Sequence, residues 1–307
     1  MKKLWPFFAA VAVYVIYGTS YLPIKILSVE LRGDVLQLLA FRFTLASLGL
    51  LVLILTGVLK VDYRGKKMRQ VFLIGLFQPI LYYICETYGL QRFPSSQAGI
   101  LMAMTPVISS LMAVLVFHEH PRASQWGCIG ISILGVVTLN LGPADTAATP
   151  LGFVLILGAA FMTSLNNITV RRARANFSPM ELTFVTSVMA AVFFSGMSAA
   201  QHAAAGTLNR YFAPLQNGRV VASLLFLGLV SSIGATMLQN IVLSKLPMAV
   251  VSSFAGIATV VSVLVGVGLL GETYTLIDFA GTVLILSGVF GVSYFAKNSR
   301  RTDVVRE

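Results

Sequence analysis

Charged side chains are scarce in this sequence. Lys, Arg, Asp and Glu together supply 11% of its 307 residues, whereas hydrophobic residues supply 57%. An average soluble domain carries about 25% charged residues, and a compact domain of this length could not hide so much apolar surface from water. The composition therefore argues against a soluble protein and predicts a membrane protein.

Cysteine and histidine are also rare, which bears on catalysis. The two cysteines, Cys85 and Cys128, argue against a disulfide framework, and the three histidines leave no evident pairing of nucleophile and base. His118 and His120 flank Glu119 at a spacing that would point them apart on a helix, so no metal site is predicted. The motif G-x-x-x-x-G-K-[ST] does not occur, which argues against ATP as the energy source. We therefore predict no enzyme, no catalytic residue and no cofactor.

The apolar residues are grouped in runs that are long enough to cross a bilayer as helices. A hydrocarbon core about 30 Å thick needs about 20 helical residues. Ten such runs are predicted to span the membrane: Leu4–Ile24, Leu36–Leu59, Gln70–Leu90, Ser96–Phe117, Ala123–Leu141, Leu151–Val170, Met180–Ala200, Val220–Leu243, Met248–Leu270 and Leu276–Ala296. The first run follows two lysines but lacks an A-x-A cleavage pattern, so we expect a retained helix rather than a signal peptide.

The basic residues predict the orientation of these spans. With the N-terminus placed in the cytoplasm, 16 of the 22 Lys and Arg residues fall in inside segments, and only five fall outside. The positive-inside rule therefore predicts that both termini are cytoplasmic. It also accounts for the net charge of +11 without nucleic acid, because a basic segment such as Lys60–Arg69 is typical of a loop beside anionic lipid.

The chain contains an internal repeat. A shift of 153 residues places Pro94 on Pro247 and Glu119 on Glu272 without a gap. Five spans are thereby followed by five equivalent spans, and an odd number forces the two halves to enter the membrane from opposite sides. The sequence predicts an all-α membrane protein with ten transmembrane helices as a 5+5 inverted-topology repeat, an arrangement found in secondary transporters. The predicted divisions are a first repeat over 1–145, a second over 146–297 and a cytoplasmic tail over 298–307.

These residues resemble a known family, the ten-helix EamA-type branch of the drug/metabolite transporter superfamily, with repeats over about 6–141 and 151–294. The matching features are Tyr17-Gly18-Thr19-Ser20 with Pro23, Arg42, the stretch from Gly89 to Ala98, Thr105-Pro106, Glu119 and Gly271-Glu272. The family usually has Trp where Tyr17 stands and lacks Pro94. The resemblance implies export or exchange of amino acids, nucleotides or other small metabolites across the plasma membrane, which is the inner membrane in a bacterium.

Two ionisable residues, Arg42 and Glu86, stand out inside the predicted spans. Ionisable groups within hydrocarbon are costly, so each is expected to have a role or a partner. Both lie in the outer halves of their spans and could form a buried ion pair that fixes the packing of spans two and three. Alternatively, one of them binds the opposite charge of a substrate, or Glu86 exchanges a proton. The sequence leaves these alternatives open.

Other polar and aromatic residues are predicted to line the same path. Gln78, Tyr82 and Glu86 recur at intervals of four, which places them on one helix face near Pro79. The shift of 153 residues places Glu86 on Gln239. The remaining predicted pathway residues are Tyr17, Tyr83, Met102, Asn166, Asn167 and Asn240. Hydrogen bonds that hold helices together would explain the amides equally well.

Prolines and helix-end glutamates are predicted to act as hinges, caps or gates, and glycines are predicted to allow close helix packing. Pro79 and Pro106 are predicted hinges, and Glu119 and Glu272 are predicted to cap helix ends or act as gates. Glycines of spans five and ten are predicted to allow close helix approach, with homodimer contact as the alternative. These glycines are Gly127, Gly130, Gly135, Gly281, Gly288 and Gly291.

Taken together, the sequence predicts a secondary active transporter that exports or exchanges a small polar organic solute, an amino acid or related metabolite, by alternating access about a central cavity. The alternatives are uptake, or a drug or cation efflux carrier with proton coupling. A membrane enzyme or a channel is less favoured. The expected partners are the solute and the bilayer, with the chain acting as a monomer or a homodimer.

Overall fold

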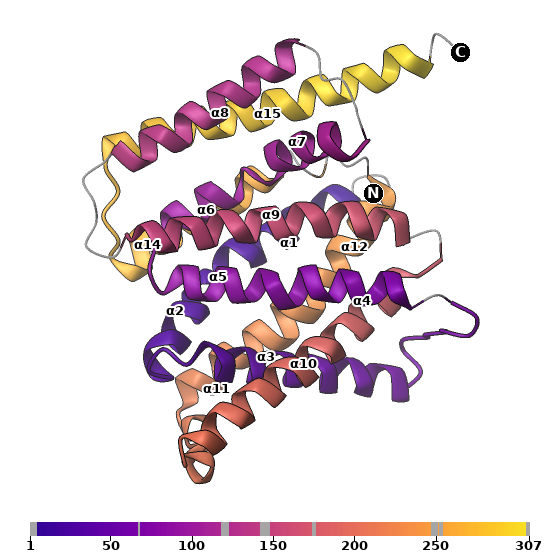
Figure 1. The fold of residues 1–307 in the computed structure, drawn as a ribbon, viewed down its shortest axis with the longest axis vertical. Helices are drawn as coiled ribbons and strands as arrows, with labels where there is room; N and C mark the ends of the chain where they lie inside the picture. The colour runs from indigo at the N-terminus through magenta and orange to yellow at the C-terminus, as the bar shows by residue number, and fades with distance from the viewer. Residues whose placement is uncertain are drawn as a thin grey trace.

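The structure, a computed structural model, describes residues 5–66, 68–117, 123–141, 148–173, 176–246, 251 and 254–304. The elements that it describes are helices (Figure 1). Seven of the helical stretches are long and apolar enough to cross a membrane, and two shorter apolar helices cover Ala123–Leu139 and Ala255–Leu270. The prediction of an all-helical protein with many spans is therefore confirmed.

The helices follow the predicted hydrophobic runs closely. The first half contains α1 (Trp5–Thr19), α2 (Tyr21–Glu30), α3 (Val35–Leu55), α4 (Arg69–Gly75), η1 (Leu76–Leu81), α5 (Tyr82–Leu90), α6 (Ser95–Met102), α7 (Thr105–Phe117) and α8 (Ala123–Leu141). The second half contains α9 (Pro150–Ala173), α10 (Pro179–Ala204), η2 (Leu208–Arg210), η3 (Ala213–Gln216), α11 (Gly218–Leu225), η4 (Phe226–Ala235), α12 (Thr236–Lys245), α14 (Ala255–Leu270) and α15 (Leu276–Val304).

Several predicted spans are interrupted. The first divides into α1 and α2 at Ser20, and the eighth contains the π-helix η4. The third contains the π-helix η1, in which Gln78 leaves the helical conformation (φ −145°, ψ 117°) before the cis-bonded Pro79. The fourth divides just before Pro106, which lies in the first turn of α7, where its missing N–H costs little. The structure thus places helix breaks at both proposed hinge prolines and adds breaks that the sequence did not predict.

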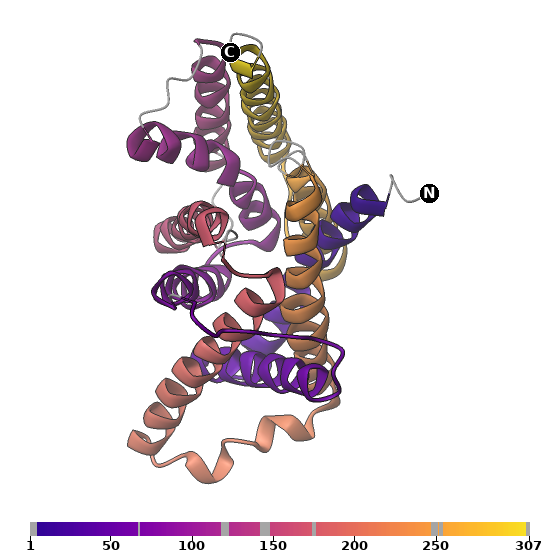
Figure 2. The ribbon, with the colours of Figure 1, turned by 90° about the vertical axis from the view of Figure 1, so that its right-hand side faces the viewer.

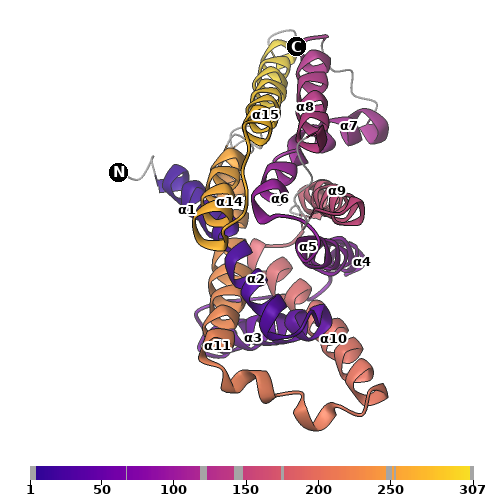
Figure 3. The same cartoon turned by 90° about the vertical axis from the view of Figure 1, so that its left-hand side faces the viewer.

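The two halves pack against each other in equivalent pairs. α3 packs along α10, α8 along α15 and α6 along α14, and each pair joins equivalent predicted spans of the two repeats. Likewise α5 packs on α9, and the equivalent α12 packs on α1. Figure 1 shows the α8–α15 pair at one end of the molecule and the α3–α10 pair at the other, and Figures 2 and 3 show the same order from the two sides.

α8 and α15 run in opposite directions. An ideal Cβ built on Gly135 of α8 would lie 2.7 Å from Ile285 of α15, and one built on Gly291 would overlap Cys128 of α8. Residue numbers therefore rise along one helix as they fall along the facing one. This opposed packing of equivalent spans is what an inverted repeat requires.

The glycines of α8 and α15 divide into two groups. Added Cβ atoms at Gly135, Gly281, Gly288 and Gly291 would collide with the facing helix, so these positions allow the close approach that the sequence predicts. At Gly127 and Gly130 a Cβ would meet nothing within 4 Å among the described residues. These two glycines lie away from the α8–α15 contact, so the prediction of a close intramolecular approach there is wrong.

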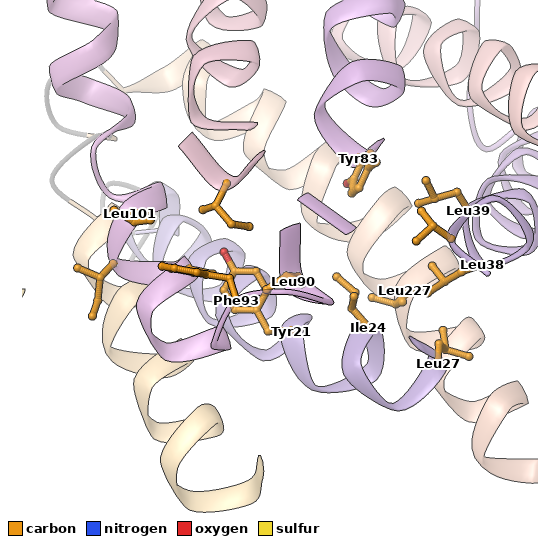
Figure 4. Packing of buried hydrophobic residues seen from close by; sticks show 14 of the residues in the cluster. Tyr21, Ile24, Leu27, Leu38, Leu39, Tyr83, Leu90, Phe93, Leu101 and Leu227 are labelled. Carbon is orange, nitrogen blue, oxygen red and sulfur yellow. The ribbon is translucent and has the colours of Figure 1, made fainter. Parts of the chain in front are cut away.

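The largest buried apolar cluster joins both halves. Figure 4 shows Tyr21, Ile24, Leu27, Leu38, Leu39, Tyr83, Leu90, Phe93, Leu101 and Leu227 of this cluster. Other large apolar side chains face outward: Phe8 is 70% exposed and Leu55 is 76% exposed. Such exposure suits a surface that faces lipid rather than water.

Candidate functional site

Arg42 lies in the middle of α3 and is 1% exposed. Its Nε donates a hydrogen bond to Ser232 Oγ at 2.9 Å, and its Nη2 lies 3.1 Å from Tyr83 OH and 3.3 Å from Ser231 Oγ. The guanidinium carbon is 4.3 Å from the centre of the Tyr83 ring, within the range of cation–π attraction. Nη1 has no hydrogen-bond partner among the described residues. Neutral groups thus hold this buried cation, and its Nη1 donors are unused.

Glu86 lies in α5 and is buried at 5% exposure. Its Oε1 accepts a hydrogen bond from the Tyr82 hydroxyl, 2.5 Å away and one helical turn back along α5. No nitrogen of Arg42 lies within 4.0 Å of the Glu86 carboxylate. The structure therefore contains no direct ion pair between them: Arg42 bonds to η4 and Tyr83 whereas Glu86 bonds to Tyr82, and the two charges interact only at longer range.

Residues from helix breaks in both halves converge here. Ser20 Oγ, at the break between α1 and α2, is hydrogen-bonded to Ser231 Oγ in η4 at 3.0 Å. Tyr82 and Tyr83 begin α5 directly after η1. Interrupted and π-helical segments often form binding sites, because they redirect side chains and free backbone groups. We call the following residues the interior polar cluster: Ser20, Arg42, Tyr82, Tyr83, Glu86, Ser231 and Ser232.

The sequence predicted only part of this cluster. Arg42, Tyr82, Tyr83 and Glu86 were among its pathway residues, and the structure brings them together. Tyr17 lies beside the cluster, close enough to interact electrostatically with Tyr83 and Arg42. Ser231 and Ser232 were missed, although two adjacent hydroxyls inside an apolar run were a usable signal. Tyr21, beside Glu86, was missed as well.

The predicted amide residues mostly fasten helices together. Asn166 Nδ2 of α9 donates to Gln78 Oε1 at 3.0 Å, and Asn240 Nδ2 of α12 donates to Thr183 Oγ1 of α10 at 3.0 Å. Gln239 lies beside Tyr14 of α1. Gln78 lies in a helix break, so it does not share one continuous helix face with Tyr82 and Glu86 as predicted. Half-buried positions are found for Met102 and Asn167.

Glu272 caps a helix of the other half. Its two carboxylate oxygens accept hydrogen bonds from the backbone N–H groups of Ser95 (2.6 Å) and Ser96 (2.8 Å), the first residues of α6. A left-handed Gly271 (φ 68°) ends α14 and turns Glu272 toward α6. The sequence predicted a local cap, whereas this carboxylate joins the two repeats, because α6 and α14 pack together. The equivalent Glu119 and its neighbours His118 and His120 lie outside the described residues.

Replacing Glu272 with alanine is expected to destabilise the protein by about 1 to 2 kcal/mol, because the N–H groups at the start of α6 would lose their acceptor. Glutamine should cost less, since one amide oxygen can still accept. The measurement is thermal unfolding of purified protein in detergent. Equal stability of Glu272→Ala and the unaltered protein would contradict the capping role.

A pocket of about 520 Å³ lies beside Glu272, at one end of the helices. Its lining residues are Lys25, Ile26, Val29, Glu30, Pro94, Arg219, Leu270 and Glu272. Both halves contribute walls, and both signs of charge are present.

At the opposite end, the loop between α3 and α4 is tied to α10. Lys66 Nζ lies 2.6 Å from Glu181 Oε2, and the Tyr63 hydroxyl donates to the Glu181 carbonyl at 3.1 Å. Burial and the negative charge of Glu181 raise the pKa of Tyr63 to about 12, so this phenol stays protonated and keeps its donor. The basic segment Lys60–Arg69 therefore also holds the loop between α3 and α4 against α10.

Comparison with known proteins supports one family. The model of the EamA-like transporter family matches residues 4–141 and again 150–294. The uncharacterized transporter YcxC of Bacillus subtilis (strain 168) is 31% identical over 287 residues, which cover 93% of this chain and 91% of that protein. The uncharacterized inner membrane transporter YedA of Escherichia coli (strain K12) is 26% identical and covers 94% of this chain and 90% of that protein.

A partial match and a solved structure complete the comparison. A protein of Salmonella typhimurium (strain LT2) named "Probable amino-acid metabolite efflux pump" is 25% identical over 214 residues, covering 68% of this chain and 70% of that protein. A solved crystal structure matches 94% of this chain and 97% of its own chain with a TM-score of 0.61 at 16% identity. That likeness shows a shared fold.

Proposed function

Because the chain belongs to the EamA-like transporter family and is a multi-pass membrane transporter, we propose that it moves a small polar organic solute by alternating access, driven by a gradient. The observation that carries this proposal is the interior polar cluster. It buries a cation and a carboxyl group in a membrane protein at the junction of two repeats, which is where transporters of repeated architecture bind their substrates.

The proposed architecture is ten transmembrane helices in a 5+5 inverted-topology repeat, with repeats over 1–145 and 146–297. The opposed packing of α8 and α15 supports it, as does the pairing of α3 with α10 and of α6 with α14. Two repeats that enter the membrane from opposite sides can exchange conformations, so that the cluster opens first to one side and then to the other.

The proposed location is the plasma membrane, or the inner membrane of a bacterium, with both termini in the cytoplasm. The distribution of basic residues supports this orientation, and the name of the Escherichia coli relative agrees with the location. The name of the Salmonella relative supports an amino acid or related metabolite as the solute and export as the direction, with exchange as the alternative that the sequence leaves open.

The proposal is tested with the purified full chain in liposomes. Counterflow of labelled amino acids should be saturable and should require the same unlabelled solute on the opposite side, because a carrier binds and releases solute on both faces. Unlabelled nucleosides and small organic cations serve as alternative solutes. A flux that never saturates and shows no counterflow would indicate a channel and would contradict the proposal.

A proton-coupled carrier, including one for uptake or for drug efflux, is the second candidate. The buried carboxyl of Glu86 favours it, because this carboxyl has no basic group within 4.0 Å among the described residues and can exchange a proton during the cycle. A pH gradient imposed on the same liposomes separates the two candidates, because only a proton-coupled carrier would accumulate solute in response to it.

Pro106 is proposed as a hinge at the break between α6 and α7. Replacing it with alanine restores an N–H and should favour a continuous helix. We expect the turnover rate to fall several-fold while solute affinity changes little, because the hinge affects movement between states more than the bound state itself. Initial rates of counterflow over a range of solute concentrations measure both quantities. Equal loss of affinity and rate would count against a hinge.

A further inference from the structure

Arg42 has hydrogen-bond donors that nothing in the described structure uses. A guanidinium group carries five N–H donors. Nε and Nη2 are directed to Ser232, Ser231 and Tyr83, whereas Nη1 has no partner among the described residues. Buried donors are normally satisfied, and each one left unsatisfied costs stability. This side of the guanidinium therefore has the character of an incomplete binding site.

No carboxylate among the described residues contacts Arg42 directly, although Glu86 interacts with it at longer range. Arg42 is the one buried Lys or Arg among the residues whose burial the structure describes. Its hydrogen-bond partners are hydroxyl groups without charge, and the carboxylate of Glu86 lies more than 4.0 Å from its nitrogens. Buried charges are normally paired, because desolvation without a counter-charge is expensive. A negatively charged group in direct contact with Nη1 is therefore the missing partner.

The chemistry of arginine narrows the class of ligand. Guanidinium N–H groups form a planar fork that donates to the oxygens of a carboxylate or of a phosphate, and the two N–H groups of Nη1 are the part of this fork that is unused. Since only one buried cation is present in the described cluster, it balances one negative charge, and a phosphate dianion would bring a second charge without compensation. Building on the transport function proposed above, we propose that the Nη1 side of Arg42 binds the carboxylate group of the transported solute.

The position of this subsite links binding to movement between states. Arg42 belongs to α3 of the first half, whereas Ser231 and Ser232 belong to η4 of the second half. Ser20, at the break between α1 and α2, is hydrogen-bonded to Ser231 as well. A carboxylate on Nη1 therefore binds where the halves meet, and its contacts differ when the halves separate. A ligand shifts a conformational equilibrium only through such a difference.

The test compares acids with their amides. Purified full-length protein is heated in detergent with alanine, leucine, phenylalanine, threonine or lactate, and separately with the corresponding primary amides. Counterflow of the same compounds is measured in liposomes. Arg42→Gln removes the cation, Arg42→Lys keeps the charge without the fork, and Arg32→Gln removes an exposed arginine from the turn after α2 as a matched control.

We expect at least one acid to stabilise and cross with the unaltered protein, with a preference over its amide of about tenfold to 100-fold, as one charge-assisted hydrogen-bond pair provides. Arg42→Gln should lose this preference while still passing the amide, Arg42→Lys should keep part of it, and Arg32→Gln should keep all of it. If solute crosses with equal preference for acid and amide, or if Arg42→Gln keeps the preference, the carboxylate subsite is overturned while the carrier function stands. If no acid or amide crosses or stabilises the protein, both proposals fail.

Discussion

Replacing Glu86 with glutamine is expected to reduce solute accumulation driven by a pH gradient on the order of 100-fold, the lower range for loss of an essential acid or base. Glutamine has nearly the same shape and can still accept the Tyr82 hydrogen bond through its amide oxygen. It cannot bind and release a proton. Counterflow without a gradient should therefore persist, because that exchange needs the binding site but no net proton movement.

The experiment uses one preparation for both measurements. Liposomes with and without a pH gradient receive the same labelled solute, and the ratio of the two uptake rates reports coupling. Asp62→Asn removes a carboxyl from an exposed loop and serves as the control. Tyr82→Phe removes the hydrogen bond to Glu86 and should shift the pH at which coupling is half-maximal. Coupling that survives unchanged in Glu86→Gln would exclude this carboxyl as the proton carrier.

Hydrophobic runs determined most of what could be predicted about the fold. The predicted run Ala123–Leu141 coincides with α8, and the other runs also match observed helical stretches, four of which are interrupted inside the run. Length and apolarity suffice here, because a lipid environment leaves the backbone few alternatives to a helix. The helix breaks at Pro79 and Pro106 could be predicted from the sequence, because proline has no backbone N–H to donate within a helix.

Features that depend on distant partners could not be predicted. The π-helix η4 contains no proline, and its Ser231 and Ser232 bond to residues of α3 and of the α1–α2 break. Arg42 and Glu86 were placed at a similar depth, yet their side chains leave the helices toward different partners. Glu272 was expected to cap a helix next to it in the sequence, but it caps α6, which belongs to the other repeat. The depth of a residue in the membrane follows from hydropathy, whereas the direction of its side chain follows from how the helices pack.

The close contact between α6 and α14 predicts a large loss of stability when Gly99 is replaced with alanine. An ideal Cβ on Gly99 of α6 would overlap the hydroxyl of Ser262 on α14 and lie 2.5 Å from its Cβ. The carbonyl of Gly99 also accepts a hydrogen bond from Thr259 at 3.1 Å, so α6 cannot shift away without losing it. Gly99→Ala is therefore expected to lower the free energy of unfolding by about 3 kcal/mol, toward the upper range for overpacking.

Comparison with other variants identifies the cause of that loss. Gly127→Ala adds the same methyl group to α8 where an ideal Cβ would meet nothing within 4 Å, so its unfolding temperature should stay near that of the unaltered protein. Ser262→Gly removes the atoms that would clash, and the double variant Gly99→Ala with Ser262→Gly should recover most of the stability, as coupled neighbours do. If Gly99→Ala is as stable as Gly127→Ala, the close approach of α6 and α14 is wrong.

The double variant also tests whether this contact moves during transport. α6 belongs to the first repeat and α14 to the second, so their surfaces must slide or separate if the halves rock against one another. If both stability and counterflow are restored, the contact acts as a fixed pivot, because any two side chains that fit together at positions 99 and 262 then suffice. Restored stability with slow counterflow would mean that the contact changes partners in the other state, where the added methyl meets atoms that Ser262→Gly does not remove. Unfolding temperature and counterflow rate, measured on the same preparation, therefore distinguish a pivot from a sliding surface.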